Sequence, residues 1–177
     1  AQRRQDVAGL DRAKVTALAG QAARAAVDYE LVRMPSDTPD ELMPEVVTMI
    51  AAINDAPLDD LQVEDEVFSA ERVRAFQTAQ RAYGRRLYDL AVRHRPTGAL
   101  AGHTAVSVEA AMPFFAHQLD TSVLAAHRGH RLGLLLKAGM LLWLREAEPQ
   151  LRTVDTWNAL SNQHMIAVNE ALDYRVV

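Results

Sequence analysis

Cysteine is absent from this sequence of 177 residues, and no apolar run approaches the length of a membrane span. Without cysteine the chain forms no disulfide, no Cys-ligated zinc site and no thiol nucleophile, which fits a reducing compartment. A helix needs about 20 consecutive apolar residues to cross a bilayer. We therefore expect a soluble, cytoplasmic protein with no membrane partner, built as one domain with a sizeable core.

An excess of positive charge is also missing. The 19 Lys and Arg are outnumbered by 23 Asp and Glu, for a formal net charge of -4. This balance gives no electrostatic case for binding nucleic acid. Six histidines are present, but only His127 and His130 have close spacing, and no third ligand type clusters with them. The sequence therefore predicts no metal site.

The most informative segment is 127–133, which reads HRGHRLG. An extended stretch at 119–124 precedes it and a Leu-rich helical pattern at 134–144 follows it. The first N–H groups of a helix have no partner inside the helix, and the helix dipole favours an anion there. Two glycines let the backbone approach a ligand, and two arginines offer donors suited to phosphate oxygens. These four residues are Arg128, Gly129, Arg131 and Gly133. The segment predicts a phosphate-binding loop.

The loop matches neither common nucleotide motif. A P-loop requires GxxxxGK[ST], whereas Lys137 lies within the predicted helix, and residues 129–131 break the GxGxxG pattern. The spacing of Arg128 and Gly133 instead resembles the pyrophosphate loop of the GNAT superfamily of N-acetyltransferases, Arg/Gln-x-x-Gly-x-Gly/Ala. Arg131 stands where this family usually has Gly, and its backbone N–H can still donate if its φ is negative.

A second segment, 162–174, resembles a later signature of the same family, Asn-x-x-Ala-x-x-Leu-Tyr-x-x-x-Gly-Phe. Asn162 and Tyr174 fall in register with it. Asn169 stands where many members have the Tyr that protonates the leaving thiolate. Asp173 replaces the Gly that usually caps the helix, and Asp enters the left-handed region at more cost than Gly. The loop, followed by Thr-Trp-Asn-Ala at 156–159, is similar to actinobacterial members that often occur as tandem domains.

The resemblance implies an α+β fold with a GNAT-like, mixed and mostly antiparallel central sheet, flanked by helices and splayed at the acyl-CoA site. It spans residues 29–177, with the last strand of the sheet apparently missing. Residues 1–28 are expected to form a helical linker or a remnant of a preceding domain. A second GNAT domain or a homodimer is the partner that this organisation implies.

Periodicity and turn residues place the elements between these motifs. Thr38, Pro39 and Glu41 predict a helix start with a capping box, and the acidic segment 55–66 reads either as a solvated connector or as a rim that attracts an amine. The expected strands are 29–34, 86–94, 99–108, 115–124 and 153–158, and the expected helices are 38–54, 69–83, 134–144 and 161–172.

By the resemblance, the cofactor is acetyl-CoA or another acyl-CoA. Its pyrophosphate would bind the loop N–H groups, and its pantetheine arm would pair with the end of the preceding strand like an added strand. The residues expected to bind the cofactor are Val123, Leu124, Arg128, Gly129, His130, Arg131, Leu132, Gly133 and Asn162.

The implied reaction is direct attack of a small-molecule amine on the thioester, with a base that accepts the amine proton. Asp120 is the first candidate for this base, and Glu109 and His117 come next. Asn169 can donate a hydrogen bond to the departing sulfur but cannot give it a proton. Asn158 and Glu109 are the expected substrate contacts. Two alternatives remain: a catalytically degenerate CoA-binding half of a tandem GNAT protein that acts as a structural or sensor module, and a helical interaction protein.

Overall fold

The computed structural model describes residues 1–56 and 66–177, and within them one seven-stranded sheet runs in the order β2-β3-β4-β5-β6-β1-β7. The strands are β1 (Gln2–Asp6), β2 (Tyr29–Arg33), β3 (Arg85–His94), β4 (Leu100–Glu109), β5 (Phe115–Val123), β6 (Thr153–Trp157) and β7 (Arg175–Val176). The helices are α1 (Arg12–Ala25), α2 (Met43–Ala51), α3 (Ala70–Ala82), α4 (Leu132–Ala147) and α5 (Gln163–Ala171), with short 3-10 turns η1 (Ala52–Asp55) and η2 (Ala125–His127).

The strands are antiparallel to their neighbours except for β5 and β6, which run parallel. These two pair only through residues 115–117 and 153–155, so within the described residues the later part of β5 has one unpaired edge. The predicted fold class, an α+β protein with a mixed, mostly antiparallel sheet, is confirmed. The sheet opens between β5 and β6, on the side where the Gly- and Arg-bearing loop begins.

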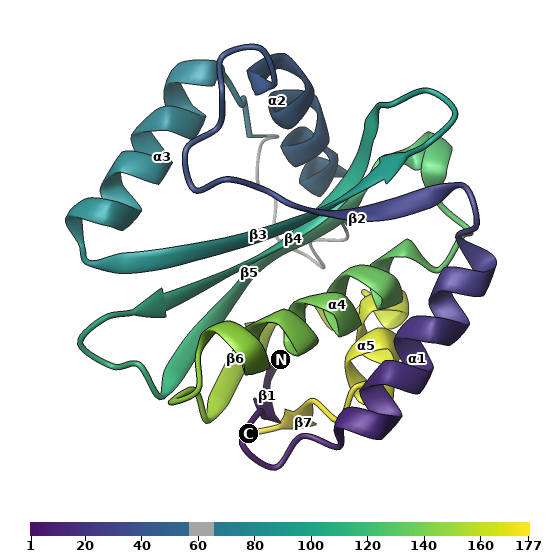
Figure 1. Cartoon of the computed structure of the whole chain (residues 1–177), viewed down its shortest axis with the longest axis vertical. Helices are drawn as coiled ribbons and strands as arrows, with labels where there is room; N and C mark the ends of the chain where they lie inside the picture. The colour runs from purple at the N-terminus through teal and green to yellow at the C-terminus, as the bar shows by residue number, and fades with distance from the viewer. Residues whose placement is uncertain (57–65) are drawn as a thin grey trace.

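The expectation of a linker over residues 1–28 needs correction. Residues 2–6 form β1, which lies between β6 and β7 and pairs with both, and α1 packs against α4 (Figure 1). The inward-facing residues of β1 are Arg3 and Gln5, which are buried although polar. A strand without alternating apolar residues carries no periodic signal, which is why the sequence pattern missed it.

Polar contacts hold this strand to β6. The guanidinium of Arg4 donates to both carboxylate oxygens of Asp155, at 2.6 and 2.7 Å, and the Gln2 amide donates to the same carboxylate at 2.8 Å. The Arg4 hydrogen bond is the main cause that holds the pKa of Asp155 below its usual value. A paired, buried carboxylate replaces the apolar contacts that β1 lacks.

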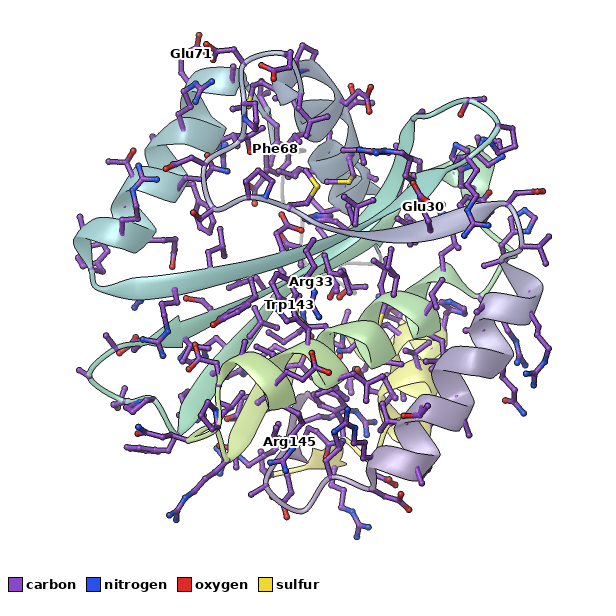
Figure 2. The ribbon with its side chains drawn as sticks, in the orientation of Figure 1. Glu30, Arg33, Phe68, Glu71, Trp143 and Arg145 are labelled. Atoms are coloured by element: carbon purple, nitrogen blue, oxygen red, sulfur yellow. The ribbon has the colours of Figure 1, made fainter. Side chains whose placement is uncertain are left out.

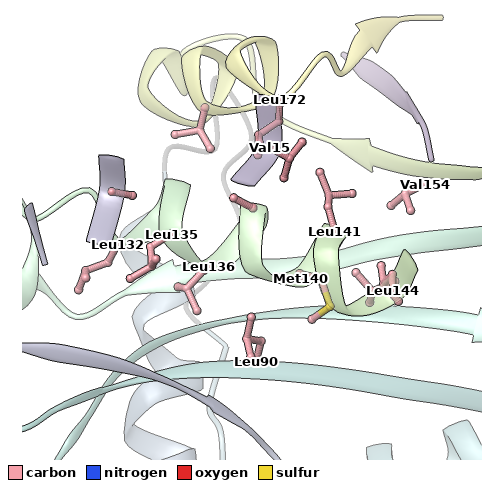
Figure 3. Packing of buried hydrophobic residues seen from close by; sticks show 14 of the residues in the cluster. Val15, Leu90, Leu132, Leu135, Leu136, Met140, Leu141, Leu144, Val154 and Leu172 are labelled. Atoms are coloured by element: carbon pink, nitrogen blue, oxygen red, sulfur yellow. The ribbon is translucent and has the colours of Figure 1, made fainter. Parts of the chain in front are cut away.

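The helices cover the two faces of the sheet, with α2 and α3 on one face and α1, α4 and α5 on the other (Figure 1). Apolar side chains of α4 form the centre of the larger core, against Leu90 of β3, Val15 of α1 and Leu172 (Figure 3). The fully or nearly fully buried members on α4 are Leu132, Leu135, Leu136, Ala138, Met140, Leu141 and Leu144. Each buried leucine stabilises the fold by about 1.5–3 kcal/mol. This packing fixes the start of α4 relative to β5.

Most element bounds agree with the sequence expectation, but the helix predicted from Thr38 begins later. Helix α2 starts at Met43 with Pro44 in its first turn, and Leu42 at the N-cap makes no side-chain cap bond. Thr38 is buried, and its hydroxyl accepts a hydrogen bond from the Gln77 amide at 2.8 Å. The Thr38 hydroxyl therefore binds Gln77 of α3 and does not cap a longer helix. Among the described helices, none combines the length and apolar character needed to cross a membrane.

Candidate active site

The loop between β5 and α4 contains two residues in the left-handed region. Gly129 has φ 88°, which glycine adopts without steric cost, and Arg131, the N-cap of α4, has φ 57°. The condition for the Arg131 N–H to donate, a negative φ, is therefore not met. Because the Cβ of a non-glycine residue crowds the backbone there, Arg131 costs about 1–2 kcal/mol relative to glycine. The loop thus adopts at Arg131 a left-handed backbone conformation that glycine would adopt without this loss of stability.

The first turn of α4 opens onto a cavity of about 510 Å³, which we call the loop pocket. No side chain among the described residues caps this helix end, so its first N–H groups lack partners inside the helix. Seven of the nine residues predicted to bind the cofactor line the loop pocket, and Leu124 and His130 do not. The seven are Val123, Arg128, Gly129, Arg131, Leu132, Gly133 and Asn162. The structure therefore brings together two motifs that lie about 30 residues apart in the sequence.

The two predicted strand positions differ in their backbone partners. The Leu124 N–H donates to the Ala101 carbonyl of β4 at 2.9 Å, so it points away from the open edge. Backbone groups of successive strand residues point to opposite sides, so those of Val123 face the open edge. The Val123 carbonyl accepts from Nε of Arg128 at 3.1 Å, while the same guanidinium donates to Asp55 at 2.6 Å. Val123 is thus the residue of this pair that offers its backbone to an added strand.

Tyr29 of β2 supports the start of the loop. Its hydroxyl lies 2.9 Å from Nδ1 of His127, and its ring lies 5.4 Å from the ring of His130. Burial, together with the neighbouring rings of His94 and His130, lowers the pKa of His127. No cluster of three or more potential ligands for a metal ion occurs among the described residues.

A β-bulge shapes the middle of β5. Thr104 pairs with Thr121 and Val106 pairs with Gln118, so Ala105 faces the two residues Leu119 and Asp120. Such a bulge re-aims side chains and is common beside active sites. As a result, Leu119 and Asp120 both line a second cavity of about 360 Å³, which we call the Asp120 pocket. Its other walls come from α2, α3, β3 and β4.

Two titratable groups that the sequence did not single out, His103 and Asp89, lie beside Asp120. Nδ1 of His103 on β4 is 3.1 Å from a carboxylate oxygen of Asp89 on β3, and both residues line the Asp120 pocket. His103 is buried, and its Nε2 has no hydrogen-bond partner among the described residues. The contact between His103 and Asp89 depends on the register of β3 and β4, so no contiguous sequence pattern predicts it.

Burial is the main influence on the ionisation of these groups. It raises the pKa of Asp120, the charges of Glu66 and Asp89 raise it further, and His103 opposes them. For His103, burial lowers the pKa, but the charge and hydrogen bond of Asp89 together with Asp120 outweigh it, so the pKa is raised overall. A carboxyl group with a raised pKa in a cleft is suited to exchange a proton with a bound ligand.

The loop pocket and the Asp120 pocket adjoin along one strand. Asp120 lines one pocket, and the next residue, Thr121, lines the other. The opposite wall shows the same division, since Ile50 belongs to the Asp120 pocket and Ala52 to the loop pocket. A ligand in the loop pocket and a ligand in the Asp120 pocket would therefore meet near the bulge of β5.

Of the predicted catalytic and substrate residues, Asn158, Asn169 and Glu109 line neither pocket, whereas Asn162 lines the loop pocket. The Asn162 side chain caps α5 by accepting from the Met165 N–H at 3.1 Å. Asn169 is buried and donates its amide to Asn158 at 2.6 Å, so the structure joins these two predicted residues. The Asn169 side-chain oxygen has no partner among the described residues. Glu109 pairs with Arg85 at 2.9 Å at the far end of β4.

Tyr174 lies next to Asn169, and Lys137 lies next to Tyr174. The Tyr174 N–H donates to the Asn169 carbonyl at 2.9 Å, and Nζ of Lys137 lies 4.4 Å from the centre of the buried Tyr174 ring. Burial lowers the pKa of Lys137 to about 7 and raises the pKa of Tyr174. Asp173, as expected, adopts the left-handed conformation, with φ 61°. Trp157 is 53% exposed and stacks on His117.

Known proteins were compared with this sequence and structure. No protein-family model matches the sequence, and a search of curated proteins finds no match. Among solved structures, a tandem GNAT protein from the clavulanic acid biosynthesis pathway is 36% identical, with a TM-score of 0.77. The match covers 98% of this chain and 49% of that protein, so the chain spans about half the length of this relative.

Two more distant structures share the fold. An acetyltransferase of the GNAT family from Streptococcus pneumoniae is 14% identical, with a TM-score of 0.61 over 80% of this chain and 81% of its own. A structure from Salmonella typhimurium, described as an acetyltransferase with its cofactor acetyl-CoA, is 12% identical, with a TM-score of 0.61 over 82% and 78%. Together with the loop, the splayed sheet and the second motif, these matches identify the chain as a member of the GNAT superfamily of acetyltransferases.

Proposed function

We propose that this chain is an N-acyltransferase that transfers the acetyl group of acetyl-CoA to the amine of a small molecule by direct attack. The observation that carries this proposal is the shared strand β5. At its end the loop pocket has the donors for a pyrophosphate, and at its bulge the Asp120 pocket holds a carboxyl group that can accept a proton. The adjacency of these two pockets supports an acyl transfer between their ligands.

The residues of the loop pocket fit an acyl-CoA. The uncapped α4 N-terminus offers N–H groups to an anion, and Arg128 and Arg131 lie beside it. Gly133 leaves room there, because a Cβ built on it would come no closer than 3.9 Å to a neighbouring atom, Cε of Met165. Val123 would pair with the pantetheine arm. Acetyl-CoA, when bound, supplies the thioester that the amine attacks.

Asp120 is the proposed base. A protonated amine has no free electron pair, so its nitrogen must lose a proton before it attacks a carbonyl carbon. The Asp120 carboxylate can take this proton, since it lies on the strand that both pockets share. Its raised pKa places it closer to neutral pH than an exposed aspartate, which favours proton transfer near the working pH.

The second candidate function is a CoA-binding half that has lost its chemistry. Asn169 stands at the position of the usual proton donor, and an amide cannot protonate a leaving thiolate. Its amide is also engaged with Asn158. A tandem organisation with a second GNAT domain, suggested by the 36% identical relative, would give such a half a structural or sensor role.

Turnover separates the two functions. We would measure release of free thiol from acetyl-CoA with a panel of small amines, comparing the intact chain with the Asp120→Asn variant. The enzyme predicts amine-dependent thiol release that the variant loses by about 100-fold or more. A chain that binds acetyl-CoA but releases no thiol with any amine would favour the degenerate half.

A further inference from the structure

We propose that the Asp120 pocket selects an amine with a single positive charge, an apolar body about the size of one ring, and no negative charge. This inference rests on the proposed function, since it assigns the Asp120 pocket to the acceptor. It adds the chemical class of the acceptor, which neither the fold nor the relatives specify.

The walls of the Asp120 pocket are largely apolar. They include Ile50 of α2, Phe68 and Phe76 near and on α3, and Leu87 and Leu119 from the sheet. Phe68 lies on the side of the sheet that carries α2 and α3 (Figure 2). The volume, about 360 Å³, is at the lower end of the range for small-molecule sites. These walls exclude water from a short alkyl or aryl body and offer nothing to a long polar one.

The polar groups of the pocket favour a cation. Its carboxylates are Glu66, Asp89 and Asp120. The guanidinium of Arg72 is engaged with the Glu66 carboxylate and the Val67 carbonyl, and it lies 5.2 Å from the centre of the Phe68 ring. A carboxylate on the ligand would therefore meet like charges and a cation that is already paired.

In its neutral form, which its raised pKa moves to a higher pH than for a free imidazole, His103 supplies the second contact for an ammonium group. When His103 is neutral and donates Nδ1–H to Asp89, its Nε2 carries a lone pair. This nitrogen is buried and has no partner among the described residues, so it lacks a hydrogen bond that a ligand N–H can make. Asp120 and His103 would thus hold two N–H groups of the ammonium, and the apolar walls would surround the rest of the molecule.

Direct binding tests the inference without relying on turnover. We would titrate the full chain at pH 8.5 with 2-phenylethylamine, phenylalanine and spermidine by calorimetry. These probes share a primary amine, but phenylalanine adds a carboxylate and spermidine adds positive charge while lacking an apolar ring. Because an added like charge beside Asp120 is strongly unfavourable, 2-phenylethylamine is expected to bind about 100-fold more tightly than phenylalanine.

Two variants assign the binding to named groups. Asp120→Asn is expected to weaken 2-phenylethylamine binding by about 10-fold or more, since it removes the charge of the contact. The matched control Glu146→Gln removes an exposed carboxylate on α4, on the other face of the sheet (Figure 1), and is expected to leave the affinity unchanged. Acetyl-CoA titrations of both variants serve as the check that the fold is retained.

The outcomes separate this inference from the proposed function. Equal or tighter binding of phenylalanine or spermidine, no effect of Asp120→Asn, or no binding of 2-phenylethylamine at millimolar concentration would overturn the inference. Thiol release with another class of amine would then leave the proposed function standing. Asp120-dependent binding of 2-phenylethylamine to a chain that releases no thiol would support the inference and count against the enzyme.

Discussion

Gly133 offers a change that separates binding from folding. It lies in the first turn of α4 and lines the loop pocket. We predict that Gly133→Asp weakens acetyl-CoA binding by roughly 30- to 1000-fold while the fold remains as stable as the wild type. Gly133→Ala is the matched control, because it adds the same Cβ without the charge.

The magnitudes follow from the surroundings of Gly133. A Cβ at this position meets Cε of Met165 at 3.9 Å and Nε2 of His164 at 4.0 Å, which are ordinary contacts. Replacing glycine within a helix gains up to about 1 kcal/mol, and an acidic group in the first turn gains a further ~0.3–1 kcal/mol from the helix dipole. Neither variant should therefore lower the free energy of unfolding. A carboxylate beside a pyrophosphate, in contrast, costs on the order of 2–4 kcal/mol, or roughly 30- to 1000-fold in affinity.

The assay combines urea unfolding with calorimetric titration by acetyl-CoA. Gly133→Ala is expected to lose less than about 10-fold in affinity, since it adds volume alone. Wild-type affinity in Gly133→Asp would refute the placement of the pyrophosphate at α4. A loss of several kcal/mol in unfolding free energy would refute the argument that this site has room.

Three further predictions concern individual residues. Arg131→Gly should raise the free energy of unfolding by about 0.5–1 kcal/mol in urea, because the relief of the left-handed strain exceeds the entropy that glycine adds to the unfolded chain. Burial lowers the pKa of Lys137 to about 7 in the folded state, against 10.5 for a free side chain. Between these pH values the unfolded state binds one more proton than the folded state, so the free energy of unfolding should rise as the pH increases from 7 to 10. Lys137→Met should remove this rise, and it should also remove a destabilisation of the folded state on the order of 5 kcal/mol at pH 7. The control is Lys14→Met, which changes the only other lysine, an exposed one, and should retain the rise. The thiol-release rate should fall toward acid pH as Asp120 becomes protonated, at a pH above that of an ordinary aspartate, and Asp120→Asn should show a low rate without this limb.

The sequence predicted the loop, the fold class and most element bounds because their signals are contiguous. The segment 127–133 contains its glycines and arginines within seven consecutive residues, and the closely spaced leucines of α4 predict a helix. The lining of the loop pocket was therefore largely predictable, including the meeting of Asn162 with the loop.

The Asp120 pocket was not predictable beyond Asp120 itself. His103 and Asp89 meet only through the register of β3 and β4, and the bulge at Leu119 turns two consecutive side chains into one pocket. Strand β1 was missed for another reason: its buried residues, Arg3 and Gln5, are polar, and they contact Glu170 and the Leu172 carbonyl in a distant part of the chain. The acidic segment was predicted as a rim or a connector, and its residues 57–65 lie outside the described part of the structure.

The central claim, that an acyl-CoA binds at the start of α4 beside β5, is tested most directly by calorimetric titration of the intact chain with acetyl-CoA. The account predicts saturable one-to-one binding near the micromolar range that weakens as salt is added, because phosphate contacts at a helix N-terminus are screened by ions. No detectable binding at millimolar acetyl-CoA, or binding that Gly133→Asp leaves unchanged, would contradict it.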